Sequence, residues 1–242
     1  MPSALNLTGI AATQEQWKLK TQAQKLAQEV LAPNAARIDR DGEFPSENIK
    51  ALGEAGLLGL TIPEELGGPG HSIQTTAYVI EQLAQGCAST AMAYTMHMSA
   101  FPLIAALVNE EQTKKFLEPV IRGEHLYSVA MTESGSGNRL WHMDSHAVQD
   151  GDEYIIDSFK SFATSCGYSD YFLVPVRANS EVGPDDLSLF IIDANGENVK
   201  PIGEWDGMGL RGNSSRPVHF DKCRVPASHR LGDPTCGFSM MF

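Results

Sequence analysis

The spacing of apolar residues changes from a helical to a strand-like period near residue 125, and this change constrains the fold more than any other feature. Before it, apolar positions recur every three or four residues, as on one face of a helix. After it, short β-branched and aromatic runs alternate with turn signals. The sequence therefore predicts an α+β chain, with an all-α N-terminal domain followed by a small antiparallel β-barrel.

Each predicted helix has an apolar stripe, and several have a capping residue at the start. Thr13 and Gln16 form a capping box at the first helix, which Pro33 is expected to end. Ser72 and Asn109 are expected to cap two later helices. The predicted stripes lie at 19–30, 49–55, 73–87, 91–108 and 116–121.

The predicted strands are short and bounded by turn signals such as Gly183-Pro184-Asp185. They lie at 127–131, 154–156, 171–176, 187–192 and 217–220. The last residues are apolar and have no evident packing partner in the sequence, which suggests a further helical domain that is cut short. We therefore predict three regions: a helical domain 1–124, a β-barrel domain 125–232 and the start of a truncated helical domain 233–242.

Charge and cysteine spacing exclude several classes of protein. A formal net charge of −12 argues against broad binding of nucleic acid or of an anionic membrane surface. The four cysteines lack C-x-x-C spacing, which is typical of free thiols in a reducing compartment. No basic segment precedes an apolar one at the N-terminus, and the apolar stretch 99–108 is about half of the ~20 residues that a membrane span needs. The sequence predicts a cytoplasmic protein.

General catalytic and metal-binding motifs are not supported. The sequence has no P-loop and no G-x-G-x-x-G motif, and Ser134 stands where a nucleophile elbow needs glycine. His142, Asp144 and His146 would share one face of a strand, but no fourth ligand accompanies them. We interpret them as a solvated strand face and predict no metal site.

Two segments suit a flat, phosphate-containing ligand, although composition alone favours an ordinary loop and an ordinary strand. In 130–138, small residues allow main-chain N–H groups to approach a phosphate or a planar ring. In 160–165, Phe162 and Thr164 lie two residues apart and would share a strand face. Neither segment identifies a function by itself.

The order of the short motifs along the chain resembles that of the acyl-CoA dehydrogenase family of flavoproteins, from near residue 13 to residue 242. Each motif is weak alone, and their common order carries the resemblance. The motifs are FP at 44–45, LGEAGL at 52–57, PEELGGPG at 63–70, AMTE at 130–133 with Gly137, GDEYII at 151–156, KSFAT at 160–164, MGLR at 208–211 and VP at 225–226.

The resemblance implies a helical domain, a β-barrel domain and a C-terminal four-helix domain that this chain lacks. It also implies an FAD-dependent oxidoreductase that dehydrogenates an acyl thioester between its α and β carbons. A carboxylate removes the α-proton while the β-hydride passes to flavin N5. In the family this carboxylate is commonly a glutamate of the last domain, so no residue of this chain is assigned a catalytic role.

The resemblance further assigns binding residues. Thr132 is expected at the N1 and C2-carbonyl edge of the flavin, Thr164 at N5, Phe162 over the ring face, and Gly137 and Asn138 near the pyrophosphate. The complete set expected to bind the cofactor is Val129, Met131, Thr132, Gly137, Asn138, Phe162, Ala163 and Thr164.

The substrate is expected to contact the long helix 91–108 and the loop after Gly137. Tyr94, Met96, His97 and Met98 are candidates on that helix, and core packing is expected for at least two of them because a helix presents only one face to a pocket. The substrate residues that we predict are Asn138, Met96 and His97. The implied partners are acyl-CoA or a related thioester, a second copy in a homodimer or homotetramer, and an electron-acceptor flavoprotein.

The chain departs from the family pattern after Thr132. Ser134 replaces a usual proline, and Asn138, Arg139 and His142 replace a usual hydroxyl, an acid and a small residue. Arg139 either strengthens contact with an anion or indicates an atypical substrate. Two alternatives stay open: a flavin-dependent monooxygenase of the same fold, and a non-catalytic partner subunit that completes a neighbour's flavin site.

Overall fold

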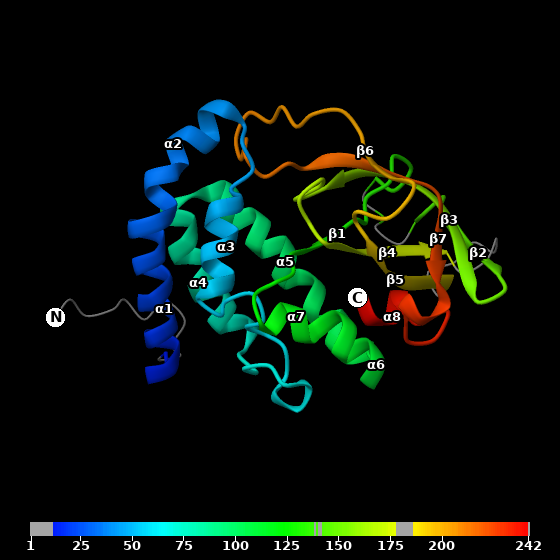
Figure 1. The fold of residues 1–242 in the computed structure, drawn as a ribbon, viewed down its shortest axis with the longest axis horizontal. Coiled ribbons are helices and arrows are strands. Elements are labelled where there is room, and N and C mark those ends of the chain that lie inside the picture. The colour runs from blue at the N-terminus through cyan, green and yellow to red at the C-terminus, as the bar shows by residue number, and fades with distance from the viewer. Residues whose placement is uncertain (1–11, 138, 140–141, 178–185, 242) are drawn as a thin grey trace.

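The computed structural model describes residues 12–137, 139, 142–177 and 186–241. Figure 1 shows the helices α1 to α7 gathered on one side and the strands on the other, with the short helix α8 beside the strands. This arrangement confirms the predicted α+β class. Among the helices in the described residues, none combines the length and apolarity needed to cross a bilayer.

The helical side begins with one nearly continuous helix made of three pieces and ends with another. The first consists of α1 (Gln14–Leu26), a π-helical turn η1 (Ala27–Leu31) and α2 (Ala32–Asp41). The last consists of α6 (Glu110–Gln112), a π-helical turn η3 (Thr113–Leu117) and α7 (Glu118–Ile121). Between them lie α3 (Ser46–Glu54), the 3₁₀ turn η2 (Glu64–Leu66), α4 (Ile73–Gly86) and α5 (Ala88–Leu107).

The predicted helix caps are confirmed. Thr13 and Gln16 form a reciprocal capping box, Ser72 Oγ accepts from the N–H of Thr75, and Asn109 caps α6. The prediction that Pro33 ends the first helix is wrong, because the helix continues to Asp41. The π-helical turn just before Pro33 shifts the hydrogen bonding, so that the missing proline N–H falls in the first turn of α2, where it is not needed.

The strands form a single sheet in the order β6-β7-β3-β2-β4-β5-β8, and β1 pairs with β4 beside this path. The strands are β1 (Tyr127–Val129), β2 (His146–Asp150), β3 (Glu153–Ala163), β4 (Tyr171–Arg177), β5 (Leu187–Asp193), β6 (Val199–Pro201), β7 (Arg216–Pro226) and β8 (Arg230–Leu231). The 3₁₀ turn η5 (Ala227–His229) precedes β8, and α8 (Gly237–Met241) follows it.

The sheet differs from the expected antiparallel barrel in two respects. β1 pairs with β4 in parallel, and β2 meets β4 in parallel at a single position. The pairings of the described strands leave β6 and β8 at two open ends, so these pairings do not close a barrel. The other strand pairs are antiparallel, as expected.

Three strands are not predicted from the sequence because they bury little. β2 buries only Ala147, β6 buries no side chain, and β8 has two residues. Because β2 begins at His146, the residues His142 and Asp144 precede the strand and do not share its face, contrary to the expectation.

β4 and β5 lie between two hydrophobic cores, which explains why their sequences are apolar on both faces. Leu173 of β4 and Ile191 of β5 pack into the core beneath the helices. Phe172 and Phe190 pack into a second core enclosed by the strands. The central strands therefore join the helical side to the β side through side chains on both faces.

The loop before β7 contacts the helical side through one main-chain and one side-chain donor. Gly212 N–H donates to Ser89 Oγ of α5 at 3.2 Å, and Arg211 Nε donates to the carbonyl of Asp39 in α2 at 2.8 Å. A Cβ on Gly212 would come within 2.5 Å of the Glu43 carbonyl oxygen and would also overlap Ile38. This close approach requires glycine.

We expect Gly212→Ala to destabilise the protein by about 1–3 kcal/mol, the usual cost of overpacking. Gly209→Ala is the matched control in the same loop, because a Cβ there meets nothing within 4 Å, so its effect should stay within about 1 kcal/mol. Urea unfolding measures both changes. Equal stabilities for the two variants would contradict the proposed packing of the loop on α2 and α5.

Candidate functional site

Two segments that the sequence singles out lie side by side. The first segment, 130–138, follows β1 and is described as far as Gly137, and the second segment, 160–165, runs from the end of β3. The N–H of Ser161 donates to the carbonyl oxygen of Thr132 at 2.7 Å. The N–H of Ala130 donates to the carbonyl of Leu173 at 3.0 Å, which fixes the first segment to β4.

The first segment presents unused donors at a partly exposed position. Within the described part of the chain, neither the main-chain N–H nor the hydroxyl of Thr132 has a hydrogen-bond partner, and the residue is half-buried. Val129 is buried, and Met131 packs against the helical core. Gly137 is exposed with φ +54° and open space beside its Cα. Asn138 lies outside the described residues.

A β-bulge positions the second segment. Lys160 pairs with Val218 of β7, whereas Ala163 pairs with Arg216, so β3 has one more residue than its partner between these pairs. The bulge breaks the alternation: Ala163 is buried, while the Phe162 ring is 56% exposed. Phe162 follows Ser161, whose N–H donates to Thr132, so an exposed aromatic residue lies one position along the chain from this main-chain bond.

Thr164 lies one residue beyond β3 and is 9% exposed, so it does not share the exposed face of Phe162. Its hydroxyl lies 2.9 Å from Ser215 Oγ, and either oxygen can donate. The N–H of Ser215 donates to Asn213 Oδ1 at 3.2 Å, and the carbonyl of Asn213 accepts from the N–H of Ser165 at 2.9 Å. Residues 213–215 therefore support the second segment, a role that no sequence motif indicated.

His97 occupies the joint between α5 and β1, not an open pocket. Its side chain is fully buried, its Nε2 lies 2.9 Å from the carbonyl oxygen of Leu58, and its Nδ1 accepts from the N–H of Tyr127 at 2.9 Å. Burial lowers the pKa of His97 to about 4, so the ring is neutral at pH 7 with both nitrogens engaged. We therefore leave His97 out of the proposed substrate site.

The neighbours of His97 on α5 divide between core and half-buried positions. Tyr94 and Met98 are buried, and the Tyr94 hydroxyl donates to the carbonyl of Leu57 at 2.9 Å. Met96 is half-buried and packs beside the helical core. Of the predicted substrate residues that the structure describes, Met96 alone has part of its side chain accessible.

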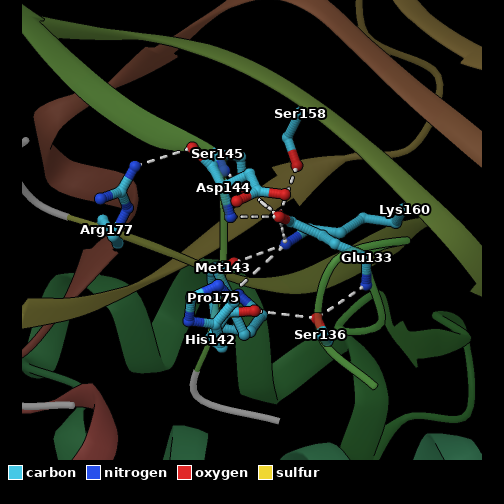
Figure 2. A network of polar contacts seen from close by, with 10 residues as sticks. All are labelled: Glu133, Ser136, His142, Met143, Asp144, Ser145, Ser158, Lys160, Pro175 and Arg177. Atoms are coloured by element: carbon cyan, nitrogen blue, oxygen red, sulfur yellow. Dashed lines mark hydrogen bonds and ion pairs between the residues drawn. The ribbon is translucent and has the colours of Figure 1, made fainter. Parts of the chain in front are cut away.

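A buried carboxylate, Glu133, follows Thr132 in the chain, and Figure 2 shows its polar contacts. Glu133 is 5% exposed, and its Oε2 accepts from the N–H groups of Asp144 at 2.6 Å and Ser145 at 3.2 Å. Its Oε1 accepts from the hydroxyls of Ser145 and Ser158. Its Oε1 also lies 2.7 Å from Nζ of Lys160, which is fully buried.

Lys160 connects this carboxylate to the middle of the sheet. Its Nζ also donates to the carbonyl oxygen of Pro175 in β4 at 2.8 Å. Burial raises the pKa of Glu133, but the Lys160 charge and the hydrogen bonds outweigh it, so the pKa lies below its ordinary value. Burial lowers the pKa of Lys160, and Glu133 opposes that shift. The result is a hydrogen-bonded ion pair inside the protein.

Glu133 and Lys160 were not among the predicted site residues, although the sequence contains a signal for Lys160. Tyr154, Ile156, Ser158 and Lys160 lie two residues apart on β3 and are all buried. A lysine at an inward position of an alternating strand requires a buried partner. The sequence alone does not indicate which carboxylate supplies it.

A surface pocket of about 500 Å³ lies elsewhere, between the ends of β3, β5 and β7. It is lined by charged and polar residues such as Glu153, Lys222 and His229 and by the buried thiol of Cys223. None of the described residues that the sequence predicts as site residues lines it.

We expect Lys160→Met to lower the free energy of unfolding by about 3–5 kcal/mol at pH 7, because it leaves the Glu133 carboxylate buried without its cation. In the native protein the lowered pKa of Glu133 contributes stability that is lost as pH falls through that pKa. The difference between variant and native protein should therefore shrink as pH falls and Glu133 takes up a proton.

The control is Lys200→Met, which removes the exposed Lys200–Asp221 pair. Its cost should be about 1 kcal/mol or less. Urea unfolding at pH 7 and at a pH near the ordinary carboxyl pKa measures both variants. A loss for Lys160→Met no larger than that for Lys200→Met would contradict a buried, ionised pair.

Comparison with known proteins identifies two domains of one family. The family model "Acyl-CoA dehydrogenase, N-terminal domain" matches residues 13–124, and "Acyl-CoA dehydrogenase, middle domain" matches residues 128–223. The probable acyl-CoA dehydrogenase YngJ of Bacillus subtilis is 33% identical over 93% of this chain and 60% of its own length. The mitochondrial isobutyryl-CoA dehydrogenase of Dictyostelium discoideum is 31% identical over 96% of this chain and 56% of its own length.

Solved structures agree with this match. A structure described as an electron transferring flavoprotein of Acidaminococcus fermentans superposes with a TM-score of 0.90 at 28% identity, and covers 96% of this chain and 61% of its own. The chain thus spans about 60% of the length of the curated relatives it matches. Since the two family models together match most of its residues, the chain belongs to the acyl-CoA dehydrogenase family.

Proposed function

We propose that this chain forms the FAD-binding part of a flavin oxidoreductase that dehydrogenates an acyl thioester between its α and β carbons. Members of the family are FAD-dependent. The observation that carries the proposal is the unpaired donor set of Thr132, joined through Ser161 to the segment of the exposed Phe162, in a family match that covers both segments. In this proposal residues 1–124 and 125–232 act as the two domains, and 233–242 begin a third.

The residues of the first segment fit the chemical needs of a flavin. When bound, FAD accepts a hydride, and the reduced ring carries negative charge near N1 and the C2 carbonyl. Donors fixed at that edge stabilise the charge as it develops. In our proposal the free N–H and hydroxyl of Thr132 are these donors. The exposed ring of Phe162 covers one face of the flavin.

The second segment suits the other edge of the ring. Oxidised N5 is a hydrogen-bond acceptor, and a hydroxyl can donate to it. When Ser215 donates to Thr164, the Thr164 hydroxyl keeps its own hydrogen for such an acceptor. The Thr164–Ser215 pair therefore holds the hydroxyl in place without using up its donor.

The remaining predicted residues contribute backbone and shape. Gly137 has open space where its Cβ would be, which allows a pyrophosphate to approach the main chain, and we assign Asn138 to the same group. In our proposal the buried Val129 and Ala163 and the partly buried Met131 form the backing of the cofactor site.

The proposal also covers the substrate and the partners of the whole protein. We assign an acyl-CoA or related thioester to a site beside Met96, and a base carboxylate to a region outside this chain. The exposed Arg139 replaces an acid of the family pattern, which favours an atypical, anionic group on the substrate. We also propose a cytoplasmic homo-oligomer that passes electrons to an electron-transferring flavoprotein. One similar structure is described as an electron transferring flavoprotein.

We expect the natural full-length protein to bind FAD and to lose the visible absorption of oxidised flavin when an acyl-CoA is added without oxygen. A set of straight-chain, branched and carboxylated acyl-CoAs identifies the substrate in the same experiment. Bound FAD that no thioester reduces would contradict dehydrogenation. Bound FAD that reacts with oxygen only after reduction by another donor would favour the monooxygenase alternative.

Two variants test the residue assignment in this assay. Thr132→Ala removes the free hydroxyl and should slow flavin reduction by roughly a factor of 10 to 100, because one donor at the charged edge is lost while the main-chain N–H remains. Thr132→Ser keeps the hydroxyl and should stay close to the native rate. If the two variants reduce the flavin at equal rates, the hydroxyl of Thr132 is not part of the proposed site.

A further inference from the structure

We propose that the buried Glu133–Lys160 ion pair is a positioning element for the flavin, and that it holds the two cofactor-binding segments at a fixed separation. This inference rests on the proposed function and adds a role for two residues that are not expected to touch the cofactor. It assigns them an effect on FAD affinity that is separable from their effect on stability.

The pair lies next to a main-chain hydrogen bond that joins the two segments. The carbonyl of Thr132 accepts from the N–H of Ser161, and Glu133 and Lys160 are the immediate neighbours of these two residues. The ion pair and the main-chain bond therefore form two adjacent links between the same pieces of backbone. Loss of the ion pair leaves the main-chain bond as the remaining direct link between these neighbours in the described structure.

The side chains that would support the site are buried, whereas the side chains that would contact the cofactor are at least partly exposed. Glu133 and Lys160 point toward one another, as Figure 2 shows, and their side chains are buried, 5% and 0% exposed. The residues on the cofactor side, Thr132 and Phe162, are half-buried and exposed. Because the inward side chains connect to both segments, a change in their separation moves the outward groups that would hold the ring.

The pair also extends to other elements that surround the site. Glu133 accepts from the main chain of Asp144 and Ser145, just before β2, and Lys160 donates to the carbonyl of Pro175 in β4. Packing alone does not require such groups, because hydrophobic residues of similar volume often replace a buried ion pair without loss of stability. What the pair provides, and an apolar pair does not, is directional bonding between named backbone groups.

The test compares a single variant with a double variant in the natural full-length protein. Glu133→Gln leaves Lys160 buried without its anion and should lower the thermal unfolding midpoint. Glu133→Gln combined with Lys160→Met contains no unpaired buried charge, so the midpoint should return most of the way to the native value. The dissociation constant for FAD should nevertheless stay about tenfold higher than in the native protein, the equivalent of one charged hydrogen bond.

A second readout does not depend on FAD. In FAD-free protein, the amide of Ser161 should exchange with deuterium faster in the double variant than in the native protein, because its acceptor, Thr132, is less firmly placed. The amide of Ser165, which donates to Asn213, serves as an internal control and should keep its native rate. The combination Lys200→Met with Asp221→Asn, at an exposed pair, should change neither quantity.

Native FAD affinity and native Ser161 exchange in the double variant would overturn the inference and leave the proposed function standing. A native protein that binds no FAD would overturn the proposed function, and this inference with it. Weakened FAD binding together with faster Ser161 exchange, at a restored unfolding midpoint, would support it.

Discussion

The ion pair between Glu133 and Lys160 is the interaction on which the geometry of the site depends. A carboxylate and an ammonium are costly to bury, and here each finds further hydrogen-bond partners that offset part of the cost. Those partners come from the segments before β2 and in β3 and β4, so the ion pair joins pieces of backbone that are far apart in sequence. The segment that carries Thr132 is thereby fixed relative to the strand that carries Phe162.

The site also depends on how the sheet meets the helices. β4 and β5 bury both faces, one beneath the helices and one inside the β side. His97 ties α5 to β1 through the N–H of Tyr127, just before the first segment begins. Gly212 lets the loop before residues 213–215 approach α5 closely. Contacts from the helical side therefore support both segments of the proposed site.

Local signals in the sequence predicted much of this fold, and long-range contacts account for what it missed. Caps at Thr13, Ser72 and Asn109 depend on neighbours three residues away, and all are confirmed. The prediction that Pro33 ends the first helix is wrong because a π-helical turn just before Pro33 accommodates the proline. The cofactor residues came from motif order, whereas Lys160, Glu133 and Ser215 find their partners only when distant strands come together, so periodicity could not pair them.

In our proposal Thr132 and Thr164 hold opposite edges of one isoalloxazine ring, while Glu133 and Lys160 fix their separation. A crystal structure of the natural full-length protein with FAD tests it most directly. We expect the Thr132 hydroxyl or N–H to lie about 3 Å from N1 or the C2 oxygen, and a Thr164 donor to lie about 3 Å from N5, with the ion pair intact. A flavin bound away from both threonines would contradict the account.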